Sequence, residues 1–247
     1  TDLMRQKQTE AESKLARLQE EIAFVIGDVN IGANASTAAF KKHLYDDLKL
    51  PVMKVTAKYQ EAMDDEALIL LSEWCEKNRP EYVPLFKLVQ EYRRWGKIKS
   101  TYIDGYLQHV SSATGRIHPD LMPLATETGR FAARKPNLQN MPRAATDDVG
   151  IRNFFIAPKG MVLLSLDFSQ IELRVGAFYC RDEKMLDTYR TGGDIHAQTT
   201  SVIYHIPFEQ AADKDAVGYK ERRTIAKNCN FGTFFGLFPK GLQRTLK

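Results

Sequence analysis

Apolar side chains recur at helical spacing through the first 109 residues, and this pattern limits the possible folds more than any other feature of the sequence. Between residues 6 and 26, Leu18, Ile22 and Val25 follow one another at intervals of three or four, and Gly27 ends the pattern. Read alone, this part of the chain favours a helical bundle with charged residues on its surface. Further helices are expected over residues 64–77, over residues 81–109, and from a cap at Ser36 or Thr37 to Leu48.

The pattern changes after Ser111, where short segments rich in Gly, Pro and Thr are typical of strands and turns. Residues 152–168 contain two strand-like runs around a Pro-Lys-Gly turn. We therefore expect a mixed α+β fold with helices on both sides of a strand-containing segment. The later helices are expected from Ser169 onward, over residues 196–203 and over residues 213–235.

Composition and short motifs exclude several classes of protein. The formal net charge is only +4, so a polyanion would have to meet local basic clusters, at residues 91–102, 129–135 and 219–227. The three cysteines lie far apart, which argues against a disulfide framework and suits a reducing compartment. No apolar run reaches the length of a membrane span, and no signal peptide opens the chain. The spacings of zinc hydrolases, P-loop enzymes and serine hydrolases do not occur either.

An abrupt change of polarity marks the stretch VLLSLDFSQIELRV, residues 162–175. Residues 162–166 read as a buried strand, and Asp167 follows directly at its polar end. Mg²⁺ prefers carboxylate and carbonyl oxygens, so Asp167 and the backbone carbonyl of Phe168 are candidate metal ligands. The alternative is a helix cap at Asp167, which is the more common use of a lone Asp before a helix, with Glu172 as an ordinary solvated residue.

A stripe of four side chains marks the stretch RRTIAKNCNFGTFFG, residues 222–236. Arg223, Lys227, Phe231 and Phe235 are spaced four apart, and each step rises ~6 Å along a helix with little rotation. Two cations followed by two rings match the phosphates, sugar and base of a nucleotide. Taken alone, the stripe is more often two core rings and two solvated cations.

The stretch TETGRFAARKPNLQNMPR, residues 126–143, gathers guanidinium and amide side chains on a loop. Such side chains donate hydrogen bonds to the acceptors that the minor groove of DNA offers at nearly every base pair. The alternative is a polar surface loop with two turns at proline.

Together and in this order, the three stretches resemble motifs of family A DNA polymerases, the bacterial polymerase-I-like enzymes. DFSQIELR resembles their first metal-binding motif, RRTIAKNCNFGTFFG their nucleotide-binding helix, and TGRFAARKPNLQNMPR their TGRxSSxxPNLQNIP segment. KIKSTYID resembles the end of their thumb. The resemblance extends from about residue 35 over most of the chain, and three motifs in register outweigh the separate alternatives.

The resemblance implies a right-hand polymerase architecture that ends before the fingers and the second palm segment are complete. The helical thumb would span residues 1–102, the palm with its antiparallel sheet residues 103–190, and the start of the fingers residues 191–247.

The resemblance also implies a role for each matching residue. Asp167 would hold two Mg²⁺ ions, one of them shared with the Phe168 carbonyl, while a primer 3′-OH attacks the α-phosphorus of a dNTP and pyrophosphate leaves. Glu172 would be a steric gate against the 2′-hydroxyl, and Lys227 the acid that protonates pyrophosphate. The implied catalytic residues are Asp167, Arg223 and Lys227. The implied nucleotide-binding residues are Gln170, Glu172, His196, Arg223, Lys227, Phe231 and Phe235. The residues implied to contact primer–template DNA are Arg130, Asn137, Gln139, Asn140, Arg93, Arg94, Lys97 and Lys99.

Three departures from the family pattern qualify these expectations. Phe235 stands where a Tyr is usual, so we expect weaker discrimination between ribose and deoxyribose. AARK, residues 132–135, replaces a Ser-rich acidic stretch. No His-Asp-Glu motif follows before the chain stops at Lys247, so we expect a fragment with little or no polymerase activity of its own.

Two alternatives keep a polymerase-like fold. One is a primer–template binding module without catalysis, and the other is a relative of single-subunit RNA polymerases, which a bulky Glu172 at the 2′ position disfavours. We expect a monomer without membrane contact, in the cytoplasm of a bacterial or phage-infected cell or in an organelle.

Overall fold

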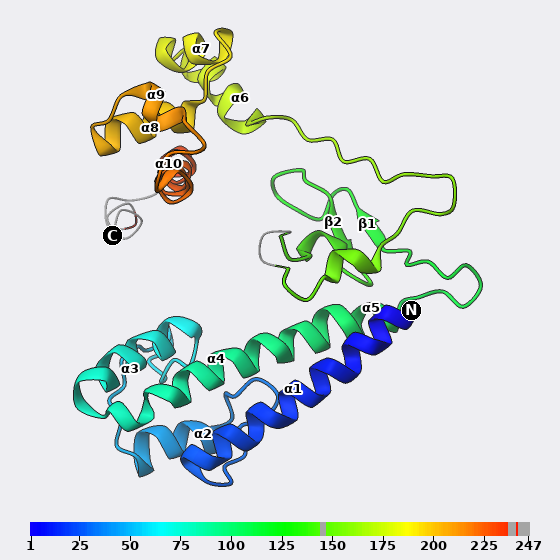
Figure 1. Ribbon diagram of the computed structural model, residues 1–247, viewed down its shortest axis with the longest axis vertical. Helices are drawn as coiled ribbons and strands as arrows, with labels where there is room; N and C mark the ends of the chain where they lie inside the picture. The colour runs from blue at the N-terminus through cyan, green and yellow to red at the C-terminus, as the bar shows by residue number, and fades with distance from the viewer. Residues whose placement is uncertain (144–146, 237–240, 242–247) are drawn as a thin grey trace. The chain divides into compact units, whose positions relative to one another are not determined.

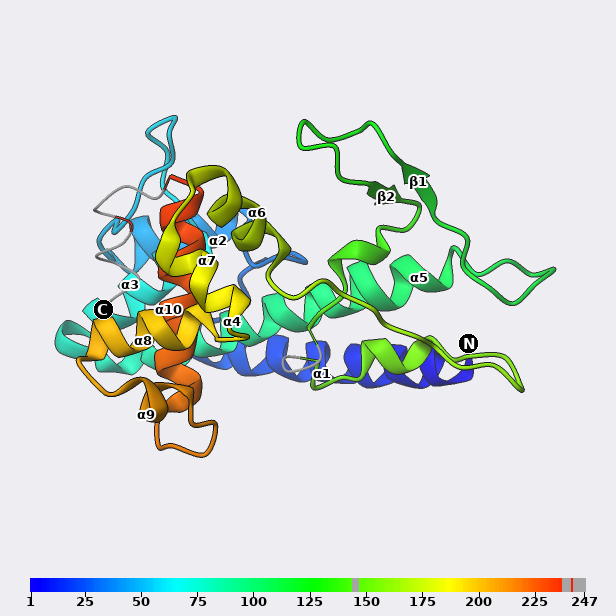
Figure 2. The ribbon, with the colours of Figure 1, turned by 90° about the horizontal axis from the view of Figure 1, so that it is seen from above.

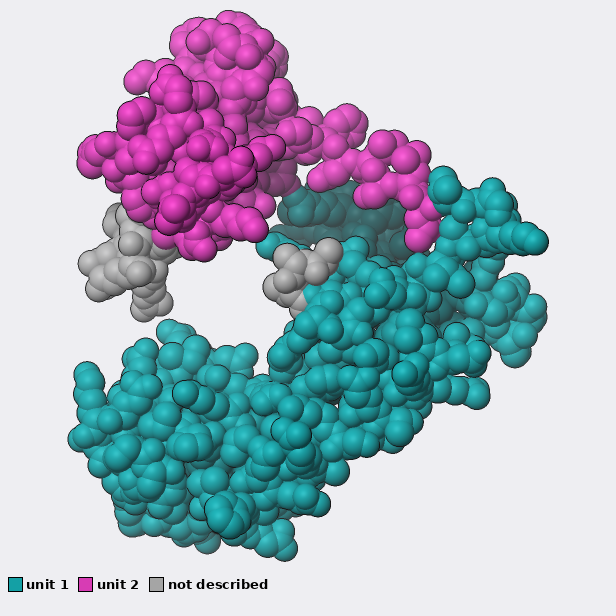
Figure 3. Space-filling view, viewed as in Figure 1, with its two compact units in different colours: residues 1–162 teal, residues 163–247 magenta. Residues whose placement is uncertain are grey.

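The computed structural model describes residues 1–143, 147–236 and 241. The chain forms two compact units, residues 1–162 and residues 163–247 (Figure 3). Each unit has its own internal packing.

Helices make up most of unit 1, as the hydrophobic spacing predicts. Figures 1 and 2 both show α1 (Asp2–Ile26) lying along α4 (Val83–Lys97). α4 continues through a π-helical stretch, Ile98–Asp104, into α5 (Gly105–Leu107), so residues 83–107 form one helical run. The expected helices are therefore confirmed, and Gly27 ends α1. The remaining helices of this unit are α2 (Ala38–Lys42), which continues into the π-helical turn His43–Asp47, α3 (Asp65–Asn78) and the 3₁₀ turn Pro80–Tyr82.

The core of unit 1 consists of the residues that create the helical periodicity. Leu18, Phe40, Leu71 and Phe86, from α1, α2, α3 and α4, are completely buried in one apolar cluster. A second cluster gathers the start of α1 around the completely buried Ile103. Burial of a side chain of this size contributes about 1.5–3 kcal/mol relative to exposure.

Thr37, one of the two residues expected to cap a helix, caps α2. Its hydroxyl accepts a hydrogen bond from the backbone N–H of Phe40 at 3.1 Å. We expect Thr37→Ala to lower the free energy of unfolding of unit 1 by about 1 kcal/mol. Both tryptophans, Trp74 and Trp95, lie in unit 1, so tryptophan fluorescence during denaturant titration measures this unit. Thr37→Ser keeps the hydroxyl and is the control. An equal loss in both variants would contradict the role of the cap.

A small antiparallel sheet follows the helices in unit 1. β1 (Asp120–Met122) pairs with β2 (Ala132–Arg134), with Leu121 opposite Ala133. Two short 3₁₀ helices, Leu138–Asn140 and Ile151–Phe154, complete the described part of this unit. The fold is thus largely helical with one small antiparallel sheet.

The prediction of two strands over residues 152–168 is wrong. Residues 151–154 form a 3₁₀ turn, and residues 161–168 have no regular secondary structure. Leu164, expected in a buried strand, is 78 % exposed. A strand needs a neighbour for its backbone groups and a second layer over its side chains, and the described residues supply neither to this segment.

Unit 2 consists of helices after this extended segment. They are α6 (Ile171–Cys180), α7 (Glu183–Arg190), α8 (Ile195–Tyr204), α9 (Phe208–Ala212) and α10 (Tyr219–Phe234) (Figure 1). α8 packs against both α9 and α10.

Two details of unit 2 differ from the sequence prediction. The helix expected from residue 213 begins only at Tyr219, because Gly218 precedes it in the left-handed conformation with φ 73°. Asp167 does not cap α6, since Gln170 occupies the position before its first residue, Ile171. No helix in the described part of the chain is long and apolar enough to span a membrane.

Candidate functional site

The stripe predicted on one helix lies on α10 of unit 2. Arg223, Lys227 and Phe231 lie within α10, and Phe235 follows directly at its C-terminal end. The Lys227 ammonium nitrogen is 5.9 Å from the centroid of the Phe231 ring, and the rings of Phe231 and Phe235 stack with centroids 6.3 Å apart. Phe235 is 66 % exposed, so the interpretation of both rings as core residues is wrong for Phe235. The helix presents a cationic half and an aromatic half in sequence.

A pocket of about 700 Å³ opens beside the cationic half of this stripe. Its wall combines the start of α6, the loop before α8 and the first half of α10. One carboxylate, Asp194, faces five cations in its lining, namely Arg174, Lys214, Lys220, Arg223 and Lys227. Such an excess of positive charge suits a polyanion with several phosphoryl oxygens.

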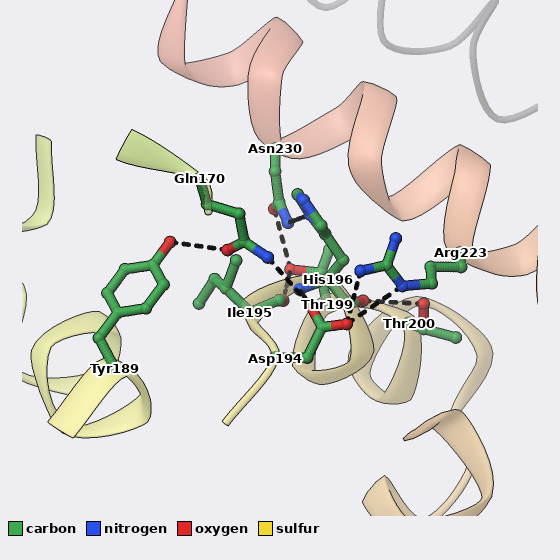
Figure 4. A network of polar contacts seen from close by, with 9 residues as sticks. All are labelled: Gln170, Tyr189, Asp194, Ile195, His196, Thr199, Thr200, Arg223 and Asn230. Atoms are coloured by element: carbon green, nitrogen blue, oxygen red, sulfur yellow. Dashed lines mark hydrogen bonds and ion pairs between the residues drawn. The ribbon is translucent and has the colours of Figure 1, made fainter. Parts of the chain in front are cut away.

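Asp194 is the central acceptor of this pocket (Figure 4). Its Oδ2 accepts hydrogen bonds from Arg223 Nη2 at 2.7 Å and from Arg223 Nε at 3.1 Å, so one carboxylate oxygen binds two N–H groups of the guanidinium. Its Oδ1 accepts a hydrogen bond from the backbone N–H of His196 at 2.9 Å, and this bond caps α8. The same oxygen accepts from Gln170 Nε2 at 3.4 Å. Burial raises the pKa of Asp194, but the bonds from Arg223 and the His196 N–H outweigh burial, and the net pKa is lowered. The carboxylate is therefore charged at neutral pH.

Gln170 extends the polar contacts from Asp194 to α7. Its Oε1 accepts from the Tyr189 hydroxyl at 3.1 Å, and the Arg174 guanidinium lies 4.4 Å from the centre of the same ring. A continuous line of contacts therefore joins Tyr189, Gln170, Asp194 and Arg223 (Figure 4). This line fixes Gln170 and Arg223 at opposite sides of one carboxylate.

His196 lies behind the pocket rather than in its lining. The residue is 2 % exposed, its ring centroid is 5.9 Å from that of Phe231, and its Nδ1 is 3.0 Å from Asn230 Nδ2. Burial lowers its pKa, the cations of Arg223 and Lys227 lower it further, and Asp194 opposes them. The imidazole is consequently neutral at neutral pH.

The two acids of the stretch at residues 162–175 are not among the described residues that line this pocket. Asp167 and Phe168 belong to the exposed segment before α6, and Glu172 is the second residue of α6. No group of three or more metal-binding side chains exists among the described residues. Asp167 and the Phe168 carbonyl offer the hard oxygen donors that suit Mg²⁺, but one carboxylate and one carbonyl do not make a complete site.

The amides of the 126–143 loop contribute to the structure of the loop itself. Asn137 Oδ1 accepts from the Gln139 N–H at 3.0 Å, and Gln139 Nε2 donates to the Phe131 carbonyl at 3.0 Å. The backbone carbonyl of Asn140 accepts from Tyr102 at 2.9 Å. Arg130, Asn137, Gln139 and Asn140 are all at least partly exposed.

The four basic residues of the α4 region have different surroundings. Arg93 donates to the carbonyls of Asn34 and Ala35, each at 2.9 Å, and its side chain is 14 % exposed, so it fastens the loop before α2. Arg94 is paired with Asp148, and Lys99 with Asp104 at 2.7 Å and Glu12 at 3.3 Å. Lys97 is exposed and lines an open pocket of about 900 Å³ on unit 1.

Sequence reasoning missed several residues of the pocket, namely Arg174, Lys214, Tyr219, Lys220 and Thr224. Lys220 precedes Arg223 by three and Lys227 by seven, which is one helix face, so its spacing was a readable signal. The contacts of Asp194 with Arg223 and of Asn230 with His196 join residues 29 and 34 positions apart. No local spacing indicates such pairs.

Comparison with known proteins gives one consistent result. Residues 1–247 match the family model described as DNA polymerase family A. The chain is 33 % identical to DNA polymerase I of Pseudomonas aeruginosa over 94 % of its own length and 24 % of that protein. It is 34 % identical to the thermostable DNA polymerase I of Thermus aquaticus over 96 % of its own length and 27 % of that protein. The chain thus spans about a quarter of these relatives.

A solved structure agrees with these relatives. The POL domain of Pol1 from M. smegmatis, in complex with DNA primer–template and dNTP, matches with a TM-score of 0.80 and 29 % sequence identity. The match covers 99 % of this chain and 40 % of that one.

Proposed function

We propose, because the chain belongs to DNA polymerase family A, that it is the dNTP- and primer-binding part of a template-directed DNA polymerase. Residues 1–102 are then the thumb, residues 103–190 the palm with the first metal-binding motif, and residues 191–247 the start of the fingers. The solved relative from M. smegmatis is a complex with a DNA primer–template and a dNTP. The partners proposed for this chain are the same two.

The pocket beside α10 carries this proposal. Five cations around one carboxylate suit a triphosphate, and the Phe231 and Phe235 rings continue the same helix face where a sugar and base would lie. Arg223 would bind phosphoryl oxygens with its planar fork, and Lys227 would bind them as a point charge. Gln170, already in the lining, would meet the same phosphates.

The proposed reaction is transfer of a nucleotide to the primer 3′-hydroxyl. The hydroxyl loses its proton to water as its oxygen forms a bond to the α-phosphorus, the bond from this phosphorus to pyrophosphate breaks, and Lys227 gives a proton to the leaving pyrophosphate. Glu172 is proposed to lie against the 2′ position of the sugar and to exclude a hydroxyl there. Asp167 and the Phe168 carbonyl, completed by phosphates of the nucleotide, are the proposed ligands of Mg²⁺, which would neutralise charge at the reacting phosphate.

Primer–template DNA is proposed to meet two surfaces of unit 1. The first is the exposed loop that carries Arg130, Asn137, Gln139 and Asn140. The second is the α4 region, where both Arg94 and Lys97 are exposed. Arg93, Arg94 and Lys99 would add positive potential from within their existing contacts.

The dependence of affinity on the number of phosphates in the nucleotide tests the proposed site. Equilibrium binding of a fluorescent dNTP, dNDP and dNMP to the full chain should weaken in that order in the presence of Mg²⁺, because each lost phosphate removes contacts to the cations. Equal affinity for all three nucleotides would contradict a triphosphate site at this pocket.

For these 247 residues alone we propose binding without turnover. The observation behind this is that the described residues contain no group of three or more metal-binding side chains, at Asp167 or elsewhere. Primer extension by the purified chain should stay at background under conditions where dNTP binding is saturated. Robust extension would refute this part of the proposal.

Sugar discrimination should improve in Phe235→Tyr. We propose that a hydroxyl on the exposed ring at position 235 would hydrogen-bond Glu172 and so strengthen the exclusion of the 2′-hydroxyl. We expect the ratio of dNTP to NTP affinity to rise by a factor of about three to ten, measured by competition against a fluorescent dNTP. Phe178→Tyr is the control, because Phe178 is an exposed ring on α6, outside the stripe on α10. An unchanged ratio in Phe235→Tyr would remove position 235 from sugar selection.

A further inference from the structure

Asn230 joins His196 to Thr199 in the interior of unit 2 (Figure 4). Its Oδ1 accepts from the Thr199 hydroxyl at 2.9 Å, and its Nδ2 lies 3.0 Å from His196 Nδ1. Asn230 is on α10, and both partners are on α8. The amide therefore fastens the imidazole to the helix that carries Arg223 and Lys227.

The chemistry of an amide assigns the proton on the imidazole. An amide nitrogen donates hydrogen bonds and does not accept them, so Nδ1 of His196 must be the acceptor in this contact. In a neutral ring the proton then lies on Nε2. The reverse orientation of the amide would place Oδ1 at the ring and would require a proton on Nδ1 instead.

The charged groups around the ring favour its neutral form. Asp194 precedes α8, and Arg223 and Lys227 reach the ring from α10. Of the other helices packed on α8, neither α7 nor α9 contributes, in the described part of the chain, a charged group that shifts its pKa. Burial and two cations against one carboxylate lower that pKa.

We propose that Asn230 is a positioning residue that holds His196 as the neutral tautomer protonated at Nε2. The ring is buried behind the pocket lining in the free chain, and Nε2–H would be its single donor to a phosphoryl oxygen that reaches it. The assignment of a phosphoryl oxygen as acceptor rests on the proposed function. The tautomer itself does not, since it depends only on the orientation of the Asn230 amide between His196 and Thr199 in the free chain.

Nitrogen NMR of the free chain tests the tautomer directly. With ¹⁵N-labelled histidine, the signals of His196 are identified by their loss in His196→Gln, and the spectrum is recorded above the pKa of the ring. We expect the proton on Nε2 in the full chain, and a mixture of tautomers in Asn230→Ala. A proton on Nδ1 of the unmodified chain would overturn the proposal without any variant.

Asn230→Asp provides a functional test with a distinct pH signature. A carboxylate only accepts, so Nδ1 must carry the proton, and the neutral ring then turns a lone pair toward the ligand. The added carboxylate should raise the pKa of His196 in this variant. Only the charged ring still donates from Nε2, so the affinity of the variant for a dNTP should fall about tenfold as the pH rises through that pKa. In the unmodified chain, Nε2 carries a proton in both the charged and the neutral imidazole, so the donor is kept at every pH.

Asn228→Asp is the matched control, since it adds the same charge at an exposed position of α10. The triphosphate also changes its protonation with pH, but it does so equally with both variants. The difference between their two pH profiles therefore reports the protein alone. Identical pH profiles of the two Asp variants, with a dNTP bound by both, would overturn the role of Asn230. If the unmodified chain binds dNTP and dNMP equally, the proposed function fails, while the NMR result still decides the tautomer.

Discussion

Replacement of Arg223 by Ala is expected to weaken dNTP binding to the chain by about 100-fold, or roughly 3 kcal/mol. Two losses add up in this variant. The guanidinium that would bind phosphoryl oxygens is lost. The Asp194 carboxylate, which pairs with Arg223 at 2.7 Å, is also left without this partner in the pocket. An unpaired carboxylate repels the triphosphate that should bind there.

Fluorescence anisotropy with a labelled dNTP measures this effect. Arg222→Ala is the control, because Arg222 is on the same helix and does not line the pocket. We expect its affinity to stay within about threefold of the unmodified chain. Equal losses in the Arg222 and Arg223 variants would mean that general charge, rather than this pocket, binds the nucleotide.

Asp194→Asn should have the opposite effect and strengthen dNTP binding about tenfold. In the free chain a triphosphate must displace this carboxylate from Arg223, because the lowered pKa of Asp194 keeps it charged at neutral pH. Asn removes the charge and keeps a side-chain oxygen for the His196 N–H, so the cap of α8 survives.

The same anisotropy titration measures the gain, and Asp187→Asn on α7 controls for net charge. In the Arg223→Ala background, Asp194→Asn should restore part of the lost affinity, which makes the two changes non-additive. Weaker binding in Asp194→Asn would show that the carboxylate supports the nucleotide rather than competing with it.

Helices and their caps were predictable because their causes are local. The spacing of Leu18 and Ile22 and the glycine at position 27 define α1 without reference to any distant residue. The stripe on α10 follows from spacing alone for the same reason. The strand expected at residues 162–166 failed because apolar composition cannot supply a partner strand, and the described chain offers none to this segment.

The candidate site was predictable in part. Of the residues that the resemblance implies at the nucleotide, Arg223, Lys227 and Gln170 line one pocket, while His196 lies buried behind it. The pairing of Arg223 with Asp194 depends on how α8 packs against α10, which no short spacing encodes. Asp194 caps α8 through the His196 N–H, which is a local contact.

We propose above all that the chain selects a nucleotide under the direction of a template. The most direct measurement is the affinity of the chain for each of the four dNTPs, in the presence of Mg²⁺ and a primer–template whose first unpaired base is varied. The account predicts that the dNTP complementary to that base binds most tightly each time. The same order of affinities with every templating base would contradict it.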